Sequence, residues 1–215
     1  SGWITRLVER LREKGLTDTA ACFDSPRNHR KELTKGWEDG YKGNRGPADP
    51  ELTNQVLLLR ELLEKAGFAC VSIDGYEADD CIVSYAKSFP GKVAILSQDK
   101  DMKQALSGER VVILRDVTWN TDDHSGDVLP EYHWYTEKPH PRIKCSNLLD
   151  DTGLTPKQFP DLQCLMGDAT DCITGAPGIG EKGALNLMRE FGSVEACIEA
   201  ARTEDARLIA MPRGK

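Results

Sequence analysis

Apolar residues follow two different periods along this chain, and the two periods predict different elements. Apolar positions recur at helical spacing in three stretches, at 4–11, 52–66 and 78–89. Short apolar runs of strand length lie at 19–23, 68–73, 93–96 and 111–114. Strands that alternate with helices favour an α/β fold, with a mostly parallel sheet flanked by helices.

The pattern becomes helical after residue 155, which indicates a second domain. Apolar spacing predicts helices at 156–166, 184–191 and 195–201. We therefore expect an α/β domain over residues 1–150 and a helical region over residues 151–215. Residues 116–144 have no clear period, and we interpret them as an irregular surface excursion with its aromatic side chains folded back on the body.

Acidic residues gather where a predicted strand gives way to a helix. Glu77, Asp79 and Asp80 lie within four positions, an arrangement that is costly unless the carboxylates are solvated, protonated or bound to cations. Further acids follow predicted strand ends or lie in the helical region: Asp24, Asp99, Asp101, Asp168 and Asp171.

Carboxylate oxygens are the ligands that hard divalent ions such as Mg²⁺ or Mn²⁺ prefer. Parallel strands end at a common edge of the sheet, so we expect these acids to converge on a site for two or more ions. Each acidic pair taken alone is better explained as a helix cap or a solvated surface group. Their joint placement at strand ends favours the metal site.

A basic segment stands out in a chain of formal net charge −7. Between Asp24 and Arg45, six Lys or Arg residues face four acids. Tyr41 offers a ring for base stacking, and Lys42 and Arg45 offer charges for phosphate. A solvated basic loop is the alternative.

A glycine-rich turn opens the second helix of the C-terminal region. Gly178, Ile179 and Gly180 would present backbone N–H groups to a phosphate, and Lys182 would add a charge beside it. The string is typical of a helix-hairpin-helix, which grips a DNA backbone without reading sequence. An ordinary turn between helices is the alternative.

The composition narrows the class of protein and the compartment in which we expect it. The chain has 215 residues, 29% of them charged and 39% hydrophobic, which is ordinary for a globular protein. It lacks a run of about 18 apolar residues, so we expect no membrane partner. Its seven cysteines are an odd number without metal-binding spacing, which favours reduced thiols in an intracellular compartment.

Together these strings resemble the 5′-nuclease family, which includes flap endonucleases and the 5′-exonuclease domain of bacterial DNA polymerase I. The matching strings occur in the family's order: Phe23-Asp24, Arg30, Tyr41-Lys42 with Asn44-Arg45, Gly75 to Asp80, Asp99-Lys100-Asp101, Gly167-Asp168 with Asp171, and Pro177 to Lys182. The resemblance implies a PIN-like α/β domain with a helix-hairpin-helix extension. It also implies Mg²⁺- or Mn²⁺-dependent hydrolysis of DNA phosphodiesters in replication and repair, near the 5′ end of flaps and of nicked or branched duplexes, and of RNA in hybrids.

The resemblance also implies roles for individual residues. The first metal region would use Asp24, Glu77, Asp79 and Asp80, and the second would use Asp99, Asp101, Asp168 and Asp171. The scissile phosphate would contact Lys42 and Arg45. DNA would be bound by Arg30, Tyr41, Lys42, Arg45, Gly178, Ile179, Gly180 and Lys182, with K⁺ as a further ion at the hairpin. We expect a monomer in the bacterial cytoplasm, with an organelle or phage origin as alternatives.

The chain departs from the family at its start. The family opens with an apolar strand that carries an Asp metal ligand, ahead of the helix that begins here near Trp3; no such strand and no Asp precede Asp18. We expect this to leave a gap in the sheet. The departure motivates a second hypothesis, a catalytically impaired protein that binds DNA junctions. A third, an acid-rich phosphohydrolase acting on small molecules, would need neither the basic segment nor the hairpin.

Overall fold

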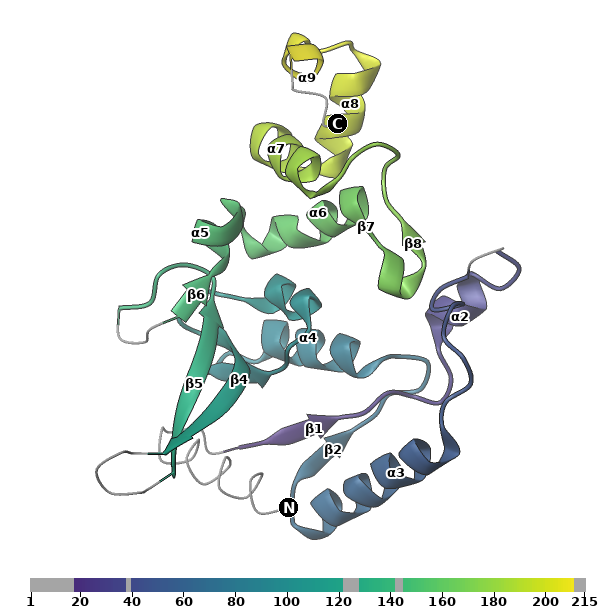
Figure 1. Cartoon of the computed structure of the whole chain (residues 1–215), viewed down its shortest axis with the longest axis vertical. Coiled ribbons are helices and arrows are strands. Elements are labelled where there is room, and N and C mark those ends of the chain that lie inside the picture. Colours follow the sequence, from purple (N-terminus) through teal and green to yellow (C-terminus); the bar gives the residue numbers. More distant parts are fainter. Residues whose placement is uncertain (1–17, 38–39, 122–127, 142–144, 211–215) are drawn as a thin grey trace. The chain divides into compact units, whose positions relative to one another are not determined.

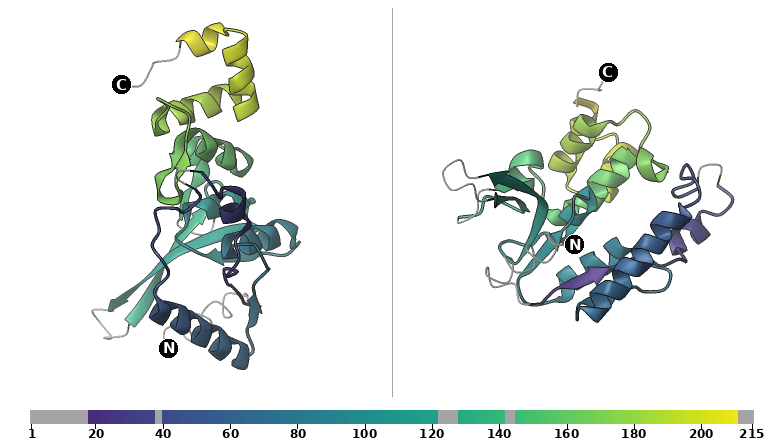
Figure 2. Two further views of the ribbon diagram at one scale, coloured as in Figure 1. Left: turned by 90° about the vertical axis from the view of Figure 1, so that its right-hand side faces the viewer. Right: turned by 60° about the horizontal axis from the view of Figure 1, so that its bottom comes forward.

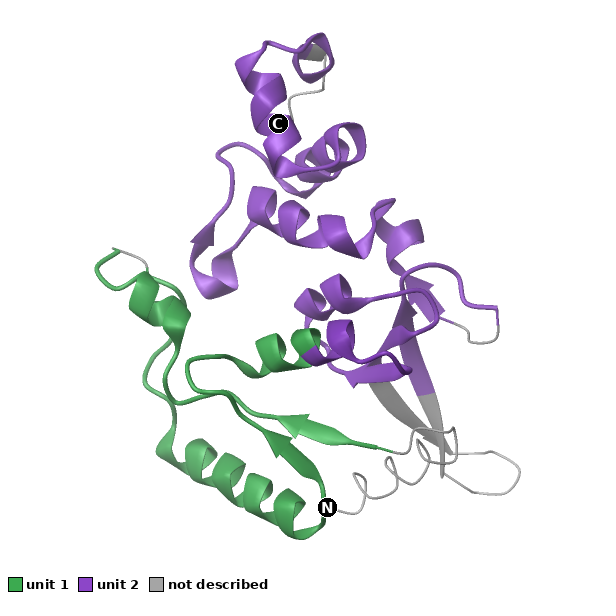
Figure 3. Ribbon diagram, turned by 180° about the vertical axis from the view of Figure 1, so that it is seen from behind, with its two compact units in different colours: residues 1–84 green, residues 85–215 purple. Residues whose placement is uncertain are grey.

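The computed structural model describes residues 18–37, 40–121, 128–141 and 145–210. It comprises two compact units, residues 1–84 and 85–215, and the division falls within helix α4 (Ala78–Ser88) (Figure 3). The boundary expected at residue 150 stays a prediction, and the helix expected at 4–11 lies outside the described residues.

The first unit contains a two-stranded parallel sheet. Strand β1 (Ala20–Cys22) pairs with β2 (Ala69–Val71), and α3 (Pro50–Lys65) runs beside them (Figures 1 and 2). Helix α3 begins as its sequence predicts, because Asp49 accepts the N–H of Glu51 at 2.9 Å and proline occupies the first position. The apolar residues of α3 stay largely exposed, with Leu52 at 59%.

Part of the basic segment of this unit is helical. It contains a short helix, α2 (His29–Leu33). The Asn28 side chain accepts the backbone N–H groups of Arg30 and Lys31 and so caps this helix.

The second unit contains a four-stranded sheet in the order β3-β4-β5-β6. Its strands are β3 (Val93–Leu96), β4 (Val111–Thr121), β5 (Val128–Thr136) and β6 (Cys145–Asn147). The β3–β4 and β5–β6 pairs are parallel, and the long β4–β5 pair is antiparallel.

The β4–β5 pair corrects the prediction of an irregular excursion at 116–144. Most of that stretch is a hairpin arm (Figure 1). Its β-branched and aromatic residues favour strands, but interspersed Asp, His and Pro residues hide the period of two. Tyr135 is buried as expected of a ring folded back on the body; the side chains of residues 116–131 are not among those described.

Short helices and a small hairpin complete the second unit. They are η1 (Lys100–Ala105), α5 (Leu148–Thr152), η2 (Pro156–Gln158), α6 (Phe159–Met166), β7 (Gly167–Asp168), η3 (Ala169–Asp171), β8 (Ile173–Thr174), α7 (Glu181–Phe191), α8 (Val194–Arg202) and α9 (Ala206–Ala210). The core of this unit includes the fully buried Met102, Ile113, Tyr135, Leu148 and Met188. Among the described residues, no helix has the length and apolar character needed to cross a membrane.

Candidate active site

The start of α4 is joined to a segment about fifty residues earlier in the chain. Asp24 accepts the N–H of Ala78 at 2.8 Å, and the N–H of His29 donates to the carbonyl of Gly75 at 2.9 Å. Gly75 has a φ of +84°, and a Cβ on it would lie 2.1 Å from Nε2 of His29. Only glycine fits there. The close approach of His29 to Gly75, together with the bond from Ala78, places Asp24 beside the acids of α4.

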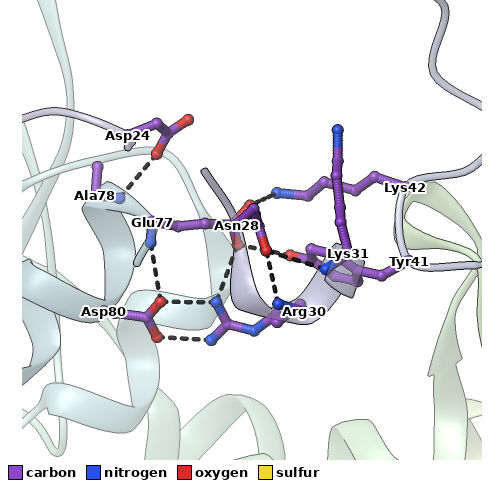
Figure 4. A network of polar contacts seen from close by, with 9 residues as sticks. All are labelled: Asp24, Asn28, Arg30, Lys31, Tyr41, Lys42, Glu77, Ala78 and Asp80. Carbon is purple, nitrogen blue, oxygen red and sulfur yellow. Dashed lines mark hydrogen bonds and ion pairs between the residues drawn. The ribbon is translucent and has the colours of Figure 1, made fainter. Parts of the chain in front are cut away.

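Glu77 is the centre of a polar network (Figure 4). Its side chain is 12% exposed. It accepts hydrogen bonds from Nδ2 of Asn28 at 2.9 Å and from the hydroxyl of Tyr41 at 2.7 Å. It also forms ion pairs with Lys42 and, at 3.3 Å, with Arg30. Burial alone would raise the pKa of Glu77, but the bonds from Lys42 and Tyr41 and the nearby charges bring the pKa below its ordinary value.

Asp80 is held by the same basic segment. Arg30 binds it through both terminal nitrogens, at 2.7 and 2.6 Å. The hydrogen bond from Arg30 is the main cause that lowers the pKa of Asp80, and the N–H of Glu77, which donates to Asp80 at 3.1 Å, adds to it. Arg30 therefore ties α2 to the first turn of α4 (Figure 4).

Tyr41 and Lys42 are held by Glu77 and by their contact with each other. Lys42 has a φ of +56°, a strained conformation for a residue with a side chain. Its ammonium lies 4.9 Å from the centre of the Tyr41 ring, and the Arg30 guanidinium lies 5.8 Å from it. Asp79 is half-buried in the first turn of α4, and Arg45 is exposed.

A second group of carboxylates lies in the second unit, where η1 follows β3. Asp99 accepts the N–H of Asp101 at 2.8 Å and so caps η1. Asp101 is half-buried and accepts a hydrogen bond from the side-chain amide of Gln163. Burial is the main cause that raises the pKa of Asp101, and the charges of Asp99 and Asp168 raise it further.

Asp168 is compensated by a lysine of η1. Its Oδ2 lies 2.8 Å from the ammonium of Lys100, and its Oδ1 accepts the N–H of Thr170 at 2.9 Å. The hydrogen bond from Lys100 is the main cause that lowers the pKa of Asp168. Asp171 ends the η3 turn that Asp168 caps.

The turn before α7 has free space around its two outer glycines. Gly178 has a φ of +76°, and a Cβ on Gly178 or Gly180 would meet no atom within 4 Å. Gly180 caps α7 without a side-chain hydrogen bond. Ile179 is half-buried against Gly183, and Lys182 is exposed. The N–H of Ile179 donates to the carbonyl of Ala176 at 3.1 Å, so the open space for a phosphate lies at Gly178 and Gly180.

The donor chemistry of both acidic groups suits a hard divalent cation, since every candidate ligand is a carboxylate. One oxygen of Asp24 and one of Asp99 have no partner among the described residues. Within the same residues, however, no three Asp, Glu, His or Cys side chains are arranged to hold a metal ion. Basic side chains instead compensate several of the acids. The residues therefore match a divalent cation in the chemical type of their ligand atoms and not in their arrangement.

Three residues that contact the acids of the two groups were not predicted as site residues from the sequence. Asn28 carries the ordinary signal of a helix cap, an Asn just before a helical turn. Lys100 is part of the matching string, but its pairing with Asp168 requires the tertiary fold. Gln163 has no sequence signal that would link it to Asp101.

Comparison with known proteins decides the family. A family model described as "5′-3′ exonuclease, N-terminal resolvase-like domain" matches residues 1–132, and one described as "5′-3′ exonuclease, C-terminal SAM fold" matches residues 154–211. The chain belongs to the 5′-3′ exonuclease family. This confirms the predicted family and the PIN-like α/β class with a helical C-terminal part.

Among curated members of the 5′-3′ exonuclease family, the chain is similar to a "5′-3′ exonuclease" of Halalkalibacterium halodurans. The two are 32% identical over 208 residues, which cover 94% of this chain and 61% of that protein. It is also 32% identical over 202 residues to DNA polymerase I of Bacillus subtilis, covering 93% of this chain and 21% of the polymerase. The chain thus spans about a fifth of the polymerases that it matches.

Solved structures of the bacteriophage T5 flap endonuclease share the fold. One, a complex with DNA and metal ions, aligns with a TM-score of 0.60 at 22% identity over 92% of this chain and 69% of that chain. Another, co-crystallised with metal ions, aligns with a TM-score of 0.62 at 22% identity over the same shares of the two chains.

Proposed function

We propose that this protein is a divalent-metal-dependent, structure-specific 5′-nuclease that hydrolyses DNA phosphodiesters near the 5′ end of flaps and of nicked or branched duplexes. One observation carries the proposal: in a 5′-3′ exonuclease family member, Glu77 and Asp80 lie directly against a basic segment. That juxtaposition would place catalytic acids and phosphate-binding cations at one site.

The metal requirement rests on the oxygen-only ligand set and on the relative whose crystals contain metal ions. The candidate ligands are those inferred from the sequence, from Asp24 to Asp80 in the first unit and from Asp99 to Asp171 in the second. When bound, Mg²⁺ or Mn²⁺ would supply an activated water and offset the charge on the leaving oxygen. We propose K⁺ as a further ion at the turn before α7.

The chain's own residues would position the substrate. Lys42 is held at the site by Glu77, and Arg45 lies three residues further along the same segment. We propose that both donate to the scissile phosphate as negative charge develops on it, which is how fixed cations accelerate phosphoryl transfer. Arg30 and Tyr41 would keep this segment in place beside α4.

The turn before α7 would bind the backbone of the duplex. Gly178, Gly180 and Lys182 offer N–H groups and a cation to a phosphate of the backbone. Contacts of this kind position DNA without reading its sequence, which suits an enzyme that recognises structure.

The test is cleavage of a 5′-labelled flap duplex by the wild type and by the Asp79→Asn and Asp99→Asn variants, beside binding of the same DNA. We expect both variants to lose cleavage by at least about a thousandfold, because each would remove a negative charge from a ligand set. Flap binding should be largely retained. Unchanged cleavage in both variants would disprove the assignment.

The ion-paired state of Glu77 and Asp80 favours one alternative, a protein that binds DNA junctions on the same scaffold without cutting them. Flap binding without cleavage in either metal would support that alternative. The absence of salt-dependent flap binding would instead favour a phosphohydrolase that acts on small molecules.

A further inference from the structure

An exposed aromatic pair lies in the first unit, formed by Tyr76 and His29. Their ring centres are 5.3 Å apart and their planes are inclined at 81°, so the two rings meet edge to face. Tyr76 nevertheless remains 48% exposed. The pair therefore combines a fixed contact with an accessible aromatic surface.

The imidazole of this pair is held from two further sides. His29 lies so close to Gly75 that a Cβ there would be 2.1 Å from its Nε2, and its own N–H donates to the carbonyl of Gly75 at 2.9 Å. Its Nδ1 lies 3.5 Å from a carboxylate oxygen of Glu32. The imidazole is thus a firm support for the neighbouring tyrosine ring.

The backbone of Tyr76 is also fixed. Its N–H donates to the carbonyl of Ile73 at 3.0 Å, and its carbonyl accepts the N–H of Ser25 at 3.1 Å. A side chain that is ordered before it meets a ligand loses little conformational entropy on binding. Tyr76 is therefore well prepared to bind a planar group.

The pair adjoins the Glu77 network on both of the segments that carry it. Tyr76 directly precedes Glu77 in the chain. His29 lies between Asn28 and Arg30. These two flanking residues contact the Glu77 carboxylate, at 2.9 Å from Asn28 and at 3.3 Å from Arg30. A group stacked on the Tyr76 ring would accordingly lie next to the candidate active site.

The other tyrosine near Glu77 is less available for stacking. The hydroxyl of Tyr41 donates to Glu77 at 2.7 Å, and its half-buried ring has the Lys42 ammonium at 4.9 Å and the Arg30 guanidinium at 5.8 Å from its centre. Tyr41 is engaged within the network, whereas Tyr76 presents about half of its surface to a ligand.

We infer that Tyr76, supported by His29, is a stacking platform for one unpaired base of the DNA, beside the phosphate that Lys42 would contact. This inference rests on the proposed function, because its ligand is a base of the same DNA. Every base has a π-face, so stacking on tyrosine tolerates any sequence but needs a base that is not covered by its neighbours. Tyr76 would thus favour an unpaired nucleotide at the site.

The experiment measures the affinity for a flap duplex in EDTA, which prevents cleavage. The intact flap is compared with flaps in which each unpaired nucleotide in turn lacks its base. In the wild type, removal of one particular base should weaken binding about tenfold. Tyr76→Leu should bind the intact flap about tenfold more weakly than the wild type does, and it should lose nothing further when that base is removed.

Two variants serve as controls. Tyr76→Phe keeps the ring and should retain the sensitivity to the missing base. Tyr85→Leu removes another exposed tyrosine, which stacks on Phe89 at 5.2 Å about two turns after the start of α4. It should behave as the wild type on every flap.

The outcomes separate the two claims. A wild type without salt-dependent flap binding would overturn the proposed function and the stacking site with it. If the wild type binds, two results would overturn the stacking site alone. One is a Tyr76→Leu variant equal to the wild type on every flap. The other is equal weakening on the intact flap and on all the flaps that lack a base, which would show that Tyr76 only supports the basic segment.

The wild type also tests the site without any variant. If Tyr76→Leu fails to fold, the comparison of flaps with the wild type decides. A single position whose base is needed for full affinity would support the platform, and no such position would overturn it.

Discussion

Glu77 and Asp101 are both carboxylates removed from full contact with water, yet the protein treats their charges in opposite ways. Glu77 has two cations, a hydroxyl and an amide on its oxygens, and its pKa lies below the ordinary value. Asp101 has the neutral amide of Gln163 and two neighbouring acids, and its pKa lies above the ordinary value. The first charge is compensated directly by two ion pairs from within the chain, whereas the second has only the nearby charge of Lys100, which pairs with Asp168.

This difference separates a structural role from a functional one. The amino-acid sequence alone, in which both groups are simply acidic residues, does not distinguish the two. The Glu77 group would be part of the fold, because it fastens the basic segment to α4. The charge of Asp101 would be held at some cost in stability, which is typical of residues kept for binding or catalysis. A bound cation would therefore relieve more repulsion in the second group than in the first.

Neutralising one acid from each group should separate the two roles by the largest difference in stability. Glu77→Gln should lower the free energy of unfolding by about 3 kcal/mol, because Arg30 and Lys42 would lose the charge that they compensate. Asp101→Asn should leave the free energy of unfolding unchanged or higher, since the charge that it removes is disfavoured. Urea denaturation at neutral pH measures both, and equal losses in the two variants would contradict the comparison.

The pH dependence of stability tests how far Arg30 compensates Glu77 and Asp80. Carboxyls whose folded-state pKa is lowered stabilise the fold above their unfolded pKa, and this contribution is lost as pH falls through the folded-state value. Arg30→Met removes part of it from Glu77 and Asp80, so it should cost about 1 kcal/mol at pH 7, a modest figure because Arg30 is partly exposed.

The difference between the wild type and Arg30→Met should then shrink as pH falls below about 4, where these carboxyls are protonated in the unfolded chain. Urea denaturation at several pH values measures it. A gap that stays constant down to pH 2 would show that Arg30 acts by packing and not by charge.

The smallest expected effect concerns Lys100, the internal counter-ion of the second group. Lys100→Met should change stability by less than about 1 kcal/mol, because its side chain is half exposed. The same change should tighten Mn²⁺ binding a few-fold by freeing Asp168 from a competing cation. Calorimetric titration with Mn²⁺ measures this, and weaker binding would mean that Lys100 organises the site.

Much of the scaffold could be predicted, because it rests on local patterns. The apolar run ending at Phe23 became β1, and Asp49 and Pro50 started α3 where expected. Asp24 follows β1 and Asp99 follows β3, as the spacing predicted. The β4–β5 arm was missed because polar residues interrupt its alternation, although its rings and β-branched residues favour strands.

The compensation of the acids could not be predicted in the same way. Arg30 and Asp80 are fifty residues apart, and their meeting depends on the close approach of His29 to Gly75. Gln163 reaches Asp101 across 62 residues. Such pairs follow from tertiary packing, so the sequence shows the charges but not which of them are neutralised.

The most direct test of the central claim is incubation of this chain with a 5′-labelled flap duplex in Mg²⁺, in Mn²⁺ and in EDTA. We predict a labelled product cut near the junction in at least one of the two metals and intact DNA in EDTA. Intact DNA under all three conditions, or equal cutting with and without metal, would contradict the assignment of these acids to a metal-dependent nuclease.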